Sequence, residues 1–99
     1  MTNTTKETES TRRHTFPLGQ IVITRNALGF LGPDEIQSGI ARHARGDWGN
    51  VCAEDWQSNE DALIHGDRLF SVFGEQPRRF WIITESDRSV TTILLPEDY

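Results

Sequence analysis

The C-terminal third of the chain carries the clearest pattern of apolar and polar positions. Three apolar segments rich in β-branched and aromatic residues, 69–73, 80–85 and 90–95, are separated by turn residues, which is typical of strands. The two connections are too short for a crossover, so neighbouring strands must run antiparallel. The pattern predicts a three-stranded antiparallel meander that stops at Pro96.

Two helices are predicted before this meander. The first begins at Pro33, with Asp34 and Glu35 in its first turn, because proline fixes a helical φ and carboxylates complement the helix dipole. The second covers about residues 53–65 and is followed by Gly66, a residue suited to a helix C-terminus.

A short strand at residues 20–24 and a helical turn at 26–31 precede the two helices. Residues 1–15 are polar and Thr-rich, so they cannot bury enough surface to offset the entropy of ordering. We predict a disordered tail over residues 1–15 and a single α+β domain over residues 16–99. In that domain a short N-terminal strand and two helices lead to the meander, and the helices pack against the sheet.

The charge and the length of the chain exclude some classes of function. The chain has 99 residues and a net charge of −5, and positions 34–67 hold eight acidic residues against two arginines. This excess disfavours binding to nucleic-acid phosphates and fits either a solvated helical face or contact with a basic protein partner. One cysteine makes no internal disulfide, and no apolar run has the length of a membrane helix. We therefore expect a cytoplasmic protein that binds no membrane.

No metal or cofactor is expected. Cys52, His14, His43 and His65 are the only thiol and imidazole groups, and they lack the spacing of a zinc site. No Gly-rich phosphate loop or dinucleotide fingerprint occurs.

Two polar clusters are candidate sites. The first lies at the end of the first helix and comprises Arg42, His43, Arg45, Asp47 and Trp48. Arginines bind phosphate or carboxylate groups by bidentate hydrogen bonds, and a helix C-terminus raises the pKa of a histidine toward the range of a general acid or base. The same residues also fit helix capping and loop anchoring, and both interpretations stay open.

The second cluster is the tip of the last hairpin, with Glu85, Asp87 and Arg88, followed by Thr91 and Thr92. It could orient a phosphate or contact a partner, or it could be local turn chemistry. The predicted binding residues are Arg42, Arg45, Asp47, Trp48, Asp87 and Arg88. Six aromatic residues are interpreted as core or interface material: Trp48, Trp56, Phe70, Phe73, Phe80 and Trp81. The C-terminal residues 97–99 are either a strand end or a recognition segment.

Three segments carry a resemblance: residues 19–22, residues 45–49, and the C-terminal run WIITESDRSVTTILLPEDY. They are similar to a family of small bacterial proteins encoded on plasmids and integrated mobile elements, over nearly all of residues 18–99. Some members are labelled type I restriction endonuclease subunit M. A methyltransferase subunit requires a Gly-rich cofactor turn and an Asn/Asp-Pro-Pro-aromatic motif, and neither occurs in this chain. The resemblance implies a mobile-element protein associated with restriction–modification, and hence with defence or counter-defence.

Two functions from different classes follow. The first is a non-enzymatic accessory protein that binds another protein and does not bind nucleic acid directly, with homodimerisation left open. The alternative is a metal-independent ribonuclease, by analogy with barnase-like and toxin-type enzymes whose helices precede an antiparallel sheet. An imidazole or carboxylate would act as general acid or base, guanidinium groups would stabilise the phosphorane, and hydroxyls would bind the scissile phosphate. These groups would come from His43, Arg45, Glu85, Arg88, Thr91 and Thr92.

Overall fold

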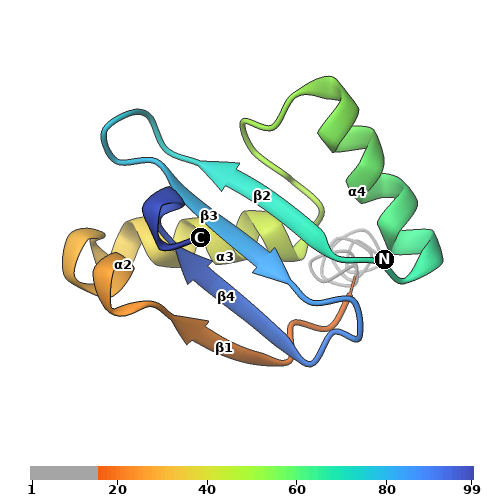
Figure 1. The fold of residues 1–99 in the computed structure, drawn as a ribbon, viewed down its shortest axis with the longest axis horizontal. Helices are drawn as coiled ribbons and strands as arrows, with labels where there is room; N and C mark the ends of the chain where they lie inside the picture. The colour runs from red at the N-terminus through yellow and green to blue at the C-terminus, as the bar shows by residue number, and fades with distance from the viewer. Residues whose placement is uncertain (1–15) are drawn as a thin grey trace, which may run out of the picture.

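The computed structural model describes residues 16–99, in which a four-stranded sheet has helices over one face and along one edge (Figure 1). The fold class is α+β, as predicted. The predicted disordered tail, residues 1–15, lies outside the described residues. In chain order the elements are β1 (Gln20–Ile23), α2 (Arg25–Phe30), α3 (Pro33–Ala44), α4 (Ala53–His65), β2 (Leu69–Phe73), β3 (Phe80–Thr84), β4 (Val90–Leu94) and the 3₁₀ turn η1 (Pro96–Asp98).

The sheet is mixed, with the strand order β1-β4-β3-β2. The predicted meander forms, because β2 pairs antiparallel with β3 and β3 with β4. The prediction did not place the N-terminal strand: β1 is a fourth strand of the same sheet and runs parallel to β4, with Gln20 opposite Val90 and Ile23 opposite Ile93. Parallel strands need a long crossover, and here it comprises everything from α2 to β3, so no local pattern indicates the pairing.

The predicted helical turn after β1 is a helix, α2, so three α-helices rather than two precede the meander in residues 16–99. Thr24 caps α2, because its Oγ1 accepts the Ala27 N–H at 3.2 Å. The Thr24 hydroxyl donates to Asp98 Oδ2 at 2.6 Å, and Asn26 donates to Asp98 Oδ1 at 2.7 Å. These bonds lower the pKa of Asp98 and fasten η1 to the start of α2.

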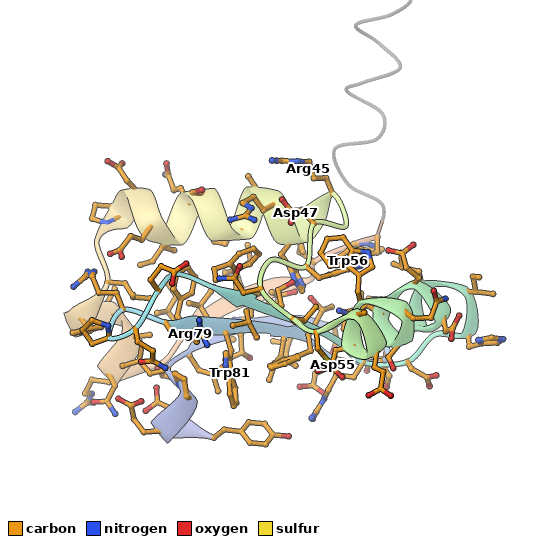
Figure 2. All side chains as sticks on the ribbon, turned by 90° about the horizontal axis from the view of Figure 1, so that it is seen from above. Arg45, Asp47, Asp55, Trp56, Arg79 and Trp81 are labelled. Atoms are coloured by element: carbon orange, nitrogen blue, oxygen red, sulfur yellow. The ribbon has the colours of Figure 1, made fainter. Side chains whose placement is uncertain are left out.

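The two faces of the sheet have different surroundings. Alternate strand residues point to opposite faces, and α3 covers the face that we call the helix face. A Cβ added at Gly39 in α3 would lie 2.8 Å from Phe80 Cε2, so the missing side chain lets α3 approach the strands. The opposite face, which we call the open face, carries Trp81 (Figure 2). The helix face comprises Leu69, Ser71, Phe73, Phe80, Ile82, Thr84, Thr91 and Ile93, and the open face comprises Phe70, Val72, Trp81, Ile83, Thr92 and Leu94.

Hydrogen bonds from α4 and from the loop before it cover the outer edge of β2. Asn59 Nδ2 donates to the Phe70 carbonyl at 2.7 Å, and Asn59 Oδ1 accepts the Phe70 N–H at 3.0 Å. Val72 N–H donates to the Trp48 carbonyl at 3.1 Å, and its carbonyl accepts the Asn50 N–H at 2.7 Å. The backbone groups that an edge strand would leave open are therefore satisfied.

Replacing Asn59 with alanine is expected to lower the free energy of unfolding by about 2–4 kcal/mol, because two backbone groups of Phe70 lose their partner beside a buried side chain. Chemical denaturation measures the change. Gln57→Ala on the same helix is the matched control, since Gln57 is exposed and bonds only Asp61. That control should change stability by less than about 0.5 kcal/mol, and equal effects of the two substitutions would contradict the role of Asn59.

Candidate functional site

His43, the candidate acid–base residue, lies near the end of α3 and is fully buried. Its Nδ1 lies 2.6 Å from Ser71 Oγ, and its Nε2 lies 2.8 Å from Thr84 Oγ1. Thr84 Oγ1 lies 2.7 Å from Thr91 Oγ1, which donates to the Leu18 carbonyl at 2.7 Å. One chain of hydrogen bonds therefore connects α3 with β2, β3, β4 and the segment before β1.

The group at the end of this series of hydrogen bonds determines which atom donates and which accepts in each of them. A carbonyl only accepts, so the Thr91 hydrogen goes to Leu18, and Thr84 must donate to Thr91. A hydroxyl has one hydrogen, so His43 Nε2 must donate to Thr84. His43 Nδ1 then accepts from the Ser71 hydroxyl. The geometry assigns His43 the neutral tautomer with its hydrogen on Nε2.

Burial lowers the pKa of His43 to about 3, and the positive charge of Arg88 acts in the same direction. The sequence predicted a raised pKa from the helix C-terminus, and this prediction was wrong because desolvation outweighs the helix dipole. The rings of Phe16 and Trp48 contact the imidazole edge-on, with centroids at 5.3 and 5.6 Å. A neutral, enclosed imidazole with both nitrogens bonded has no free proton or lone pair for a substrate.

The other members of this cluster form contacts within the domain. Arg42 donates to Asp47 at 2.8 and 3.3 Å, and these bonds are the main cause that lowers the pKa of Asp47. Trp48 is fully buried and its Nε1 donates to Glu60 at 2.9 Å. Arg45 is exposed at the C-terminal end of α3, on the side of the helix that faces away from the sheet (Figure 2). The predicted binding residues Arg42, Asp47 and Trp48 thus anchor the loop after α3, and Arg45 faces solvent.

The hairpin tip also forms internal contacts. Arg88 has a positive φ of 61°, and its guanidinium donates to the Ala62 carbonyl at 3.1 Å and the Asp67 carbonyl at 2.6 Å. It therefore caps the C-terminus of α4. Asp87 accepts the Ser89 hydroxyl at 2.7 Å and the Ser89 N–H at 3.0 Å, and these bonds lower the pKa of Asp87.

The ribonuclease candidates do not form one accessible site. His43 and Arg88 both contact the Phe16 ring, with the imidazole centroid at 5.3 Å and the Arg88 guanidinium carbon at 5.8 Å from the ring centroid. Thr91 belongs to the buried chain of hydrogen bonds, whereas Thr92 lies on the open face. Arg45 is exposed at the end of α3, and the carboxylate of Glu85 is paired with Arg68 at 3.2 Å.

The open face carries an apolar groove of about 270 Å³. Its lining consists of the side chains of Phe70, Trp81, Ile83 and Tyr99, together with Arg68. Trp81 contacts Phe70 and Tyr99 edge-on, with ring centroids at 5.1 and 5.7 Å. Trp81 projects from the side of the sheet opposite α3 (Figure 2).

Tyr99 forms a wall of this groove because the C-terminal segment is held in place. Asp98 is fastened to α2, and the Tyr99 hydroxyl accepts a hydrogen bond from Arg68 at 3.0 Å. Arg68 in turn pairs with Glu85, and the bonds to Tyr99 and Glu85 raise the pKa of Arg68. Tyr99 is nevertheless 74% exposed, so the groove is formed in advance and one of its walls faces solvent.

A smaller hollow of about 150 Å³ lies beside the C-terminal segment. Arg79 lines it, and Arg79 Nε is buried without a hydrogen-bond partner among residues 16–99. Arg78, by contrast, forms a two-bond pair with Glu35. A buried donor without an acceptor is unfavourable, so an anionic group from outside would stabilise Arg79. The hollow is lined by Phe30, Gln76, Pro77, Arg79, Leu95, Pro96 and Glu97.

No family model, curated protein or solved structure matches this chain. The function must therefore be argued from the geometry of the open face and from the chemistry of its side chains.

No three His, Cys, Asp or Glu side chains within the described part of the chain are placed to hold a metal ion. Cys52 is exposed at the start of α4. Among residues 16–99, no helix combines the length and apolar character that a membrane span requires.

The sequence contained a signal for the groove that our prediction did not use. β2 and β3 read LFSVF and FWIIT, and strands that are apolar at nearly every position are usually covered on both faces. The predicted helices cover only one face. Phe70 and Trp81, interpreted as core or interface residues, therefore belong to an apolar face that the predicted elements leave open.

Proposed function

We propose that the protein acts by binding another protein and not by catalysis, and that the groove of the open face is its contact site. The observation that carries the proposal is the lining of the groove: the half-buried rings of Phe70 and Trp81 and the exposed ring of Tyr99 present apolar surface around the buried Ile83. Exposed apolar patches of this kind mark interaction sites, and aromatic residues dominate the energetics of protein interfaces.

The chemistry of the open face supports one class of partner. The groove accepts an apolar or aromatic side chain. The charge of Arg68 is already neutralised by Glu85, whereas Arg79 has a buried Nε without a partner. A segment that combines an apolar side chain with a carboxylate would complement both features. The acidic excess between positions 34 and 67 belongs to α3, α4 and the loop between them, and its contact with a basic partner stays a prediction.

The proposal also includes where in the cell this binding takes place and which process it serves. The resemblance to plasmid and mobile-element proteins supports a cytoplasmic accessory protein linked to defence or counter-defence. The ribonuclease alternative gains no support from the geometry, because His43 and Thr91 are buried and hydrogen-bonded within the domain.

The test is affinity capture from nuclease-treated bacterial lysate with the wild type, Tyr99→Ser and Ile64→Ser. Tyr99 and Ile64 are 74% and 78% exposed, so neither substitution should disturb the fold, but only Tyr99 lines the groove. We expect one stoichiometric protein with the wild type and with Ile64→Ser. Tyr99→Ser should weaken its capture at least about tenfold, and Arg79→Gln should weaken it less.

Two results would count against the proposal. One is the absence of any stoichiometric protein in the wild-type capture. The other is a partner that all of the variants retain equally, which would place the contact elsewhere on the molecule.

A further inference from the structure

The two edges of the sheet differ in what covers them. The edge at β2 is closed by Asn59 and by the loop before α4. The edge at β1 has no described element outside it (Figure 1). Ile21 and Val22 of β1 are 43% and 40% exposed. The devices that usually protect an edge strand are a charge, a proline or a bulge, and the sequence QIVI has no charge and no proline.

The backbone of β1 also has hydrogen-bonding groups directed outward. Gln20 N–H donates to the Ser89 carbonyl at 2.9 Å, and Thr24 N–H donates to the Ile93 carbonyl at 3.0 Å. Alternate residues of a strand direct their N–H and C=O groups to opposite sides. The N–H and C=O groups of Ile21 and Ile23 therefore point away from β4, and no residue among 16–99 bonds them.

These outward groups are complementary to those of a second copy. Suppose that two β1 strands run antiparallel with Val22 on the two-fold axis. Ile21 of each copy then lies opposite Ile23 of the other copy. Both are hydrogen-bonded positions, so the pairing satisfies four N–H and four C=O groups with four backbone hydrogen bonds. The aliphatic side chains of Ile21 and Ile23 then pair on one face, and the two Val22 side chains meet on the other.

Charge favours a second copy on this edge. The chain has a net charge of −5, yet residues 16–24 contain no charged side chain. The acid-rich α4 lies at the opposite edge of the sheet, beside β2 (Figure 1). Two copies that approach through β1 therefore keep their two acid-rich α4 helices apart, which limits like-charge repulsion.

The closed edge at β2 determines how far such an assembly can grow. A head-to-tail contact would need β1 of one copy to pair with β2 of the next, and Asn59 and the loop before α4 occupy that edge. Only β1 can pair with β1. This contact has the same surface on both sides, so it closes after two copies.

We propose that the protein is a homodimer in which the two β1 strands pair antiparallel and join the sheets into one of eight strands. The two-fold axis is perpendicular to the sheet, so both α3 helices lie on one face and both grooves lie on the other. The dimer would present two grooves side by side, although its formation does not depend on what the groove binds.

The first test is the molar mass of the purified full chain over a dilution series, by sedimentation or light scattering. We expect a species of twice 11.3 kDa for the wild type. Val22→Lys should give a monomer, because two lysines would face each other on the axis, and its exposed position lets the monomer fold. Val22→Ile, which preserves the apolar pair, should remain a dimer. Circular dichroism of each variant controls for folding.

The second test reports the register. In a Cys52→Ser background, Val22→Cys should form a disulfide-linked dimer on mild oxidation, because facing non-hydrogen-bonded residues lie about 4.5 Å apart at Cα. Gln20→Cys should not, since the proposed register places Gln20 opposite Thr24. A wild-type monomer at every concentration overturns the proposal, as does a dimer that Val22→Lys leaves intact. Neither result bears on partner capture by Tyr99, so the two proposals fail independently.

Discussion

Acidification from about pH 7 to about pH 4.5 is expected to lower the free energy of unfolding by about 2–3 kcal/mol through His43 alone. His43 has a pKa of about 3 in the folded protein against 6.5 for an unperturbed histidine. Between these values the unfolded chain binds a proton that the folded chain does not, so stability falls as the pH falls. The stabilisation is complete above about pH 6.5 and decreases by about 1.4 kcal/mol per pH unit below it.

The physical reason is the chain of hydrogen bonds around His43. A proton on Nδ1 would put a positive charge in a fully buried site and would direct a second donor at Ser71. Carboxylate groups change the free energy of unfolding only at lower pH. The pKa of Glu35 is lowered to about 2, chiefly by its bonds to Arg78, and its stabilising effect begins to decrease only near the ordinary carboxylate pKa of about 4.

Urea denaturation at a series of pH values measures this dependence. His43→Gln removes the titrating group and should flatten the slope between about pH 6.5 and 4.5, whatever its baseline stability. If that variant does not fold, a nuclear magnetic resonance titration of the wild type decides the matter. His43 should show a protonated Nε2 and an unprotonated Nδ1, with no titration until the protein unfolds. A folded-state pKa near 6.5 for His43 would show that the prediction is wrong.

The second large effect on stability is expected from replacing a glycine with alanine, once in α2 and once in α3. Gly29→Ala should stabilise the protein by about 0.5–1 kcal/mol, because alanine favours a helix and an added Cβ would contact nothing within 4 Å. Gly39→Ala should destabilise it by about 1–3 kcal/mol despite the same gain in propensity. Its Cβ would lie 2.8 Å from Phe80 Cε2 and 3.2 Å from Ile82 Cδ1, two buried side chains that cannot move aside freely.

Thermal and urea denaturation of both variants give the comparison. Opposite signs are the expected result, because helix propensity is common to both positions and only Gly39 faces the sheet. Two stabilised variants would show that α3 is not packed against Phe80 as closely as the structure has it.

The sequence by itself determined the local elements. Pro33 with its two following carboxylates begins α3, Gly66 ends α4, and Pro96 stops β4. Each of these signals acts within a few residues through backbone angles, capping and turn length. For the same reason the antiparallel pairing of β2, β3 and β4 could be predicted, since short connections leave strands no other arrangement.

Gly39 illustrates the limit of such local signals. Judged by helix propensity alone, Gly39 only weakens the helix that contains it, because glycine is an unfavourable residue in a helix interior. In the folded protein it is the point at which α3 meets Phe80.

Only the tertiary structure decided which chemistry is accessible. Thr91 and Leu18 are 73 residues apart in the chain and share a hydrogen bond, and β1 joins β4 across most of the domain. Pairing over such distances depends on the assembled core and not on local propensity. That assembly encloses His43 and leaves Trp81 and Tyr99 as walls of a groove. Burial is a property of the whole packed chain, so the sequence identified the candidate residues, and the fold determined which of them solvent and partners can reach.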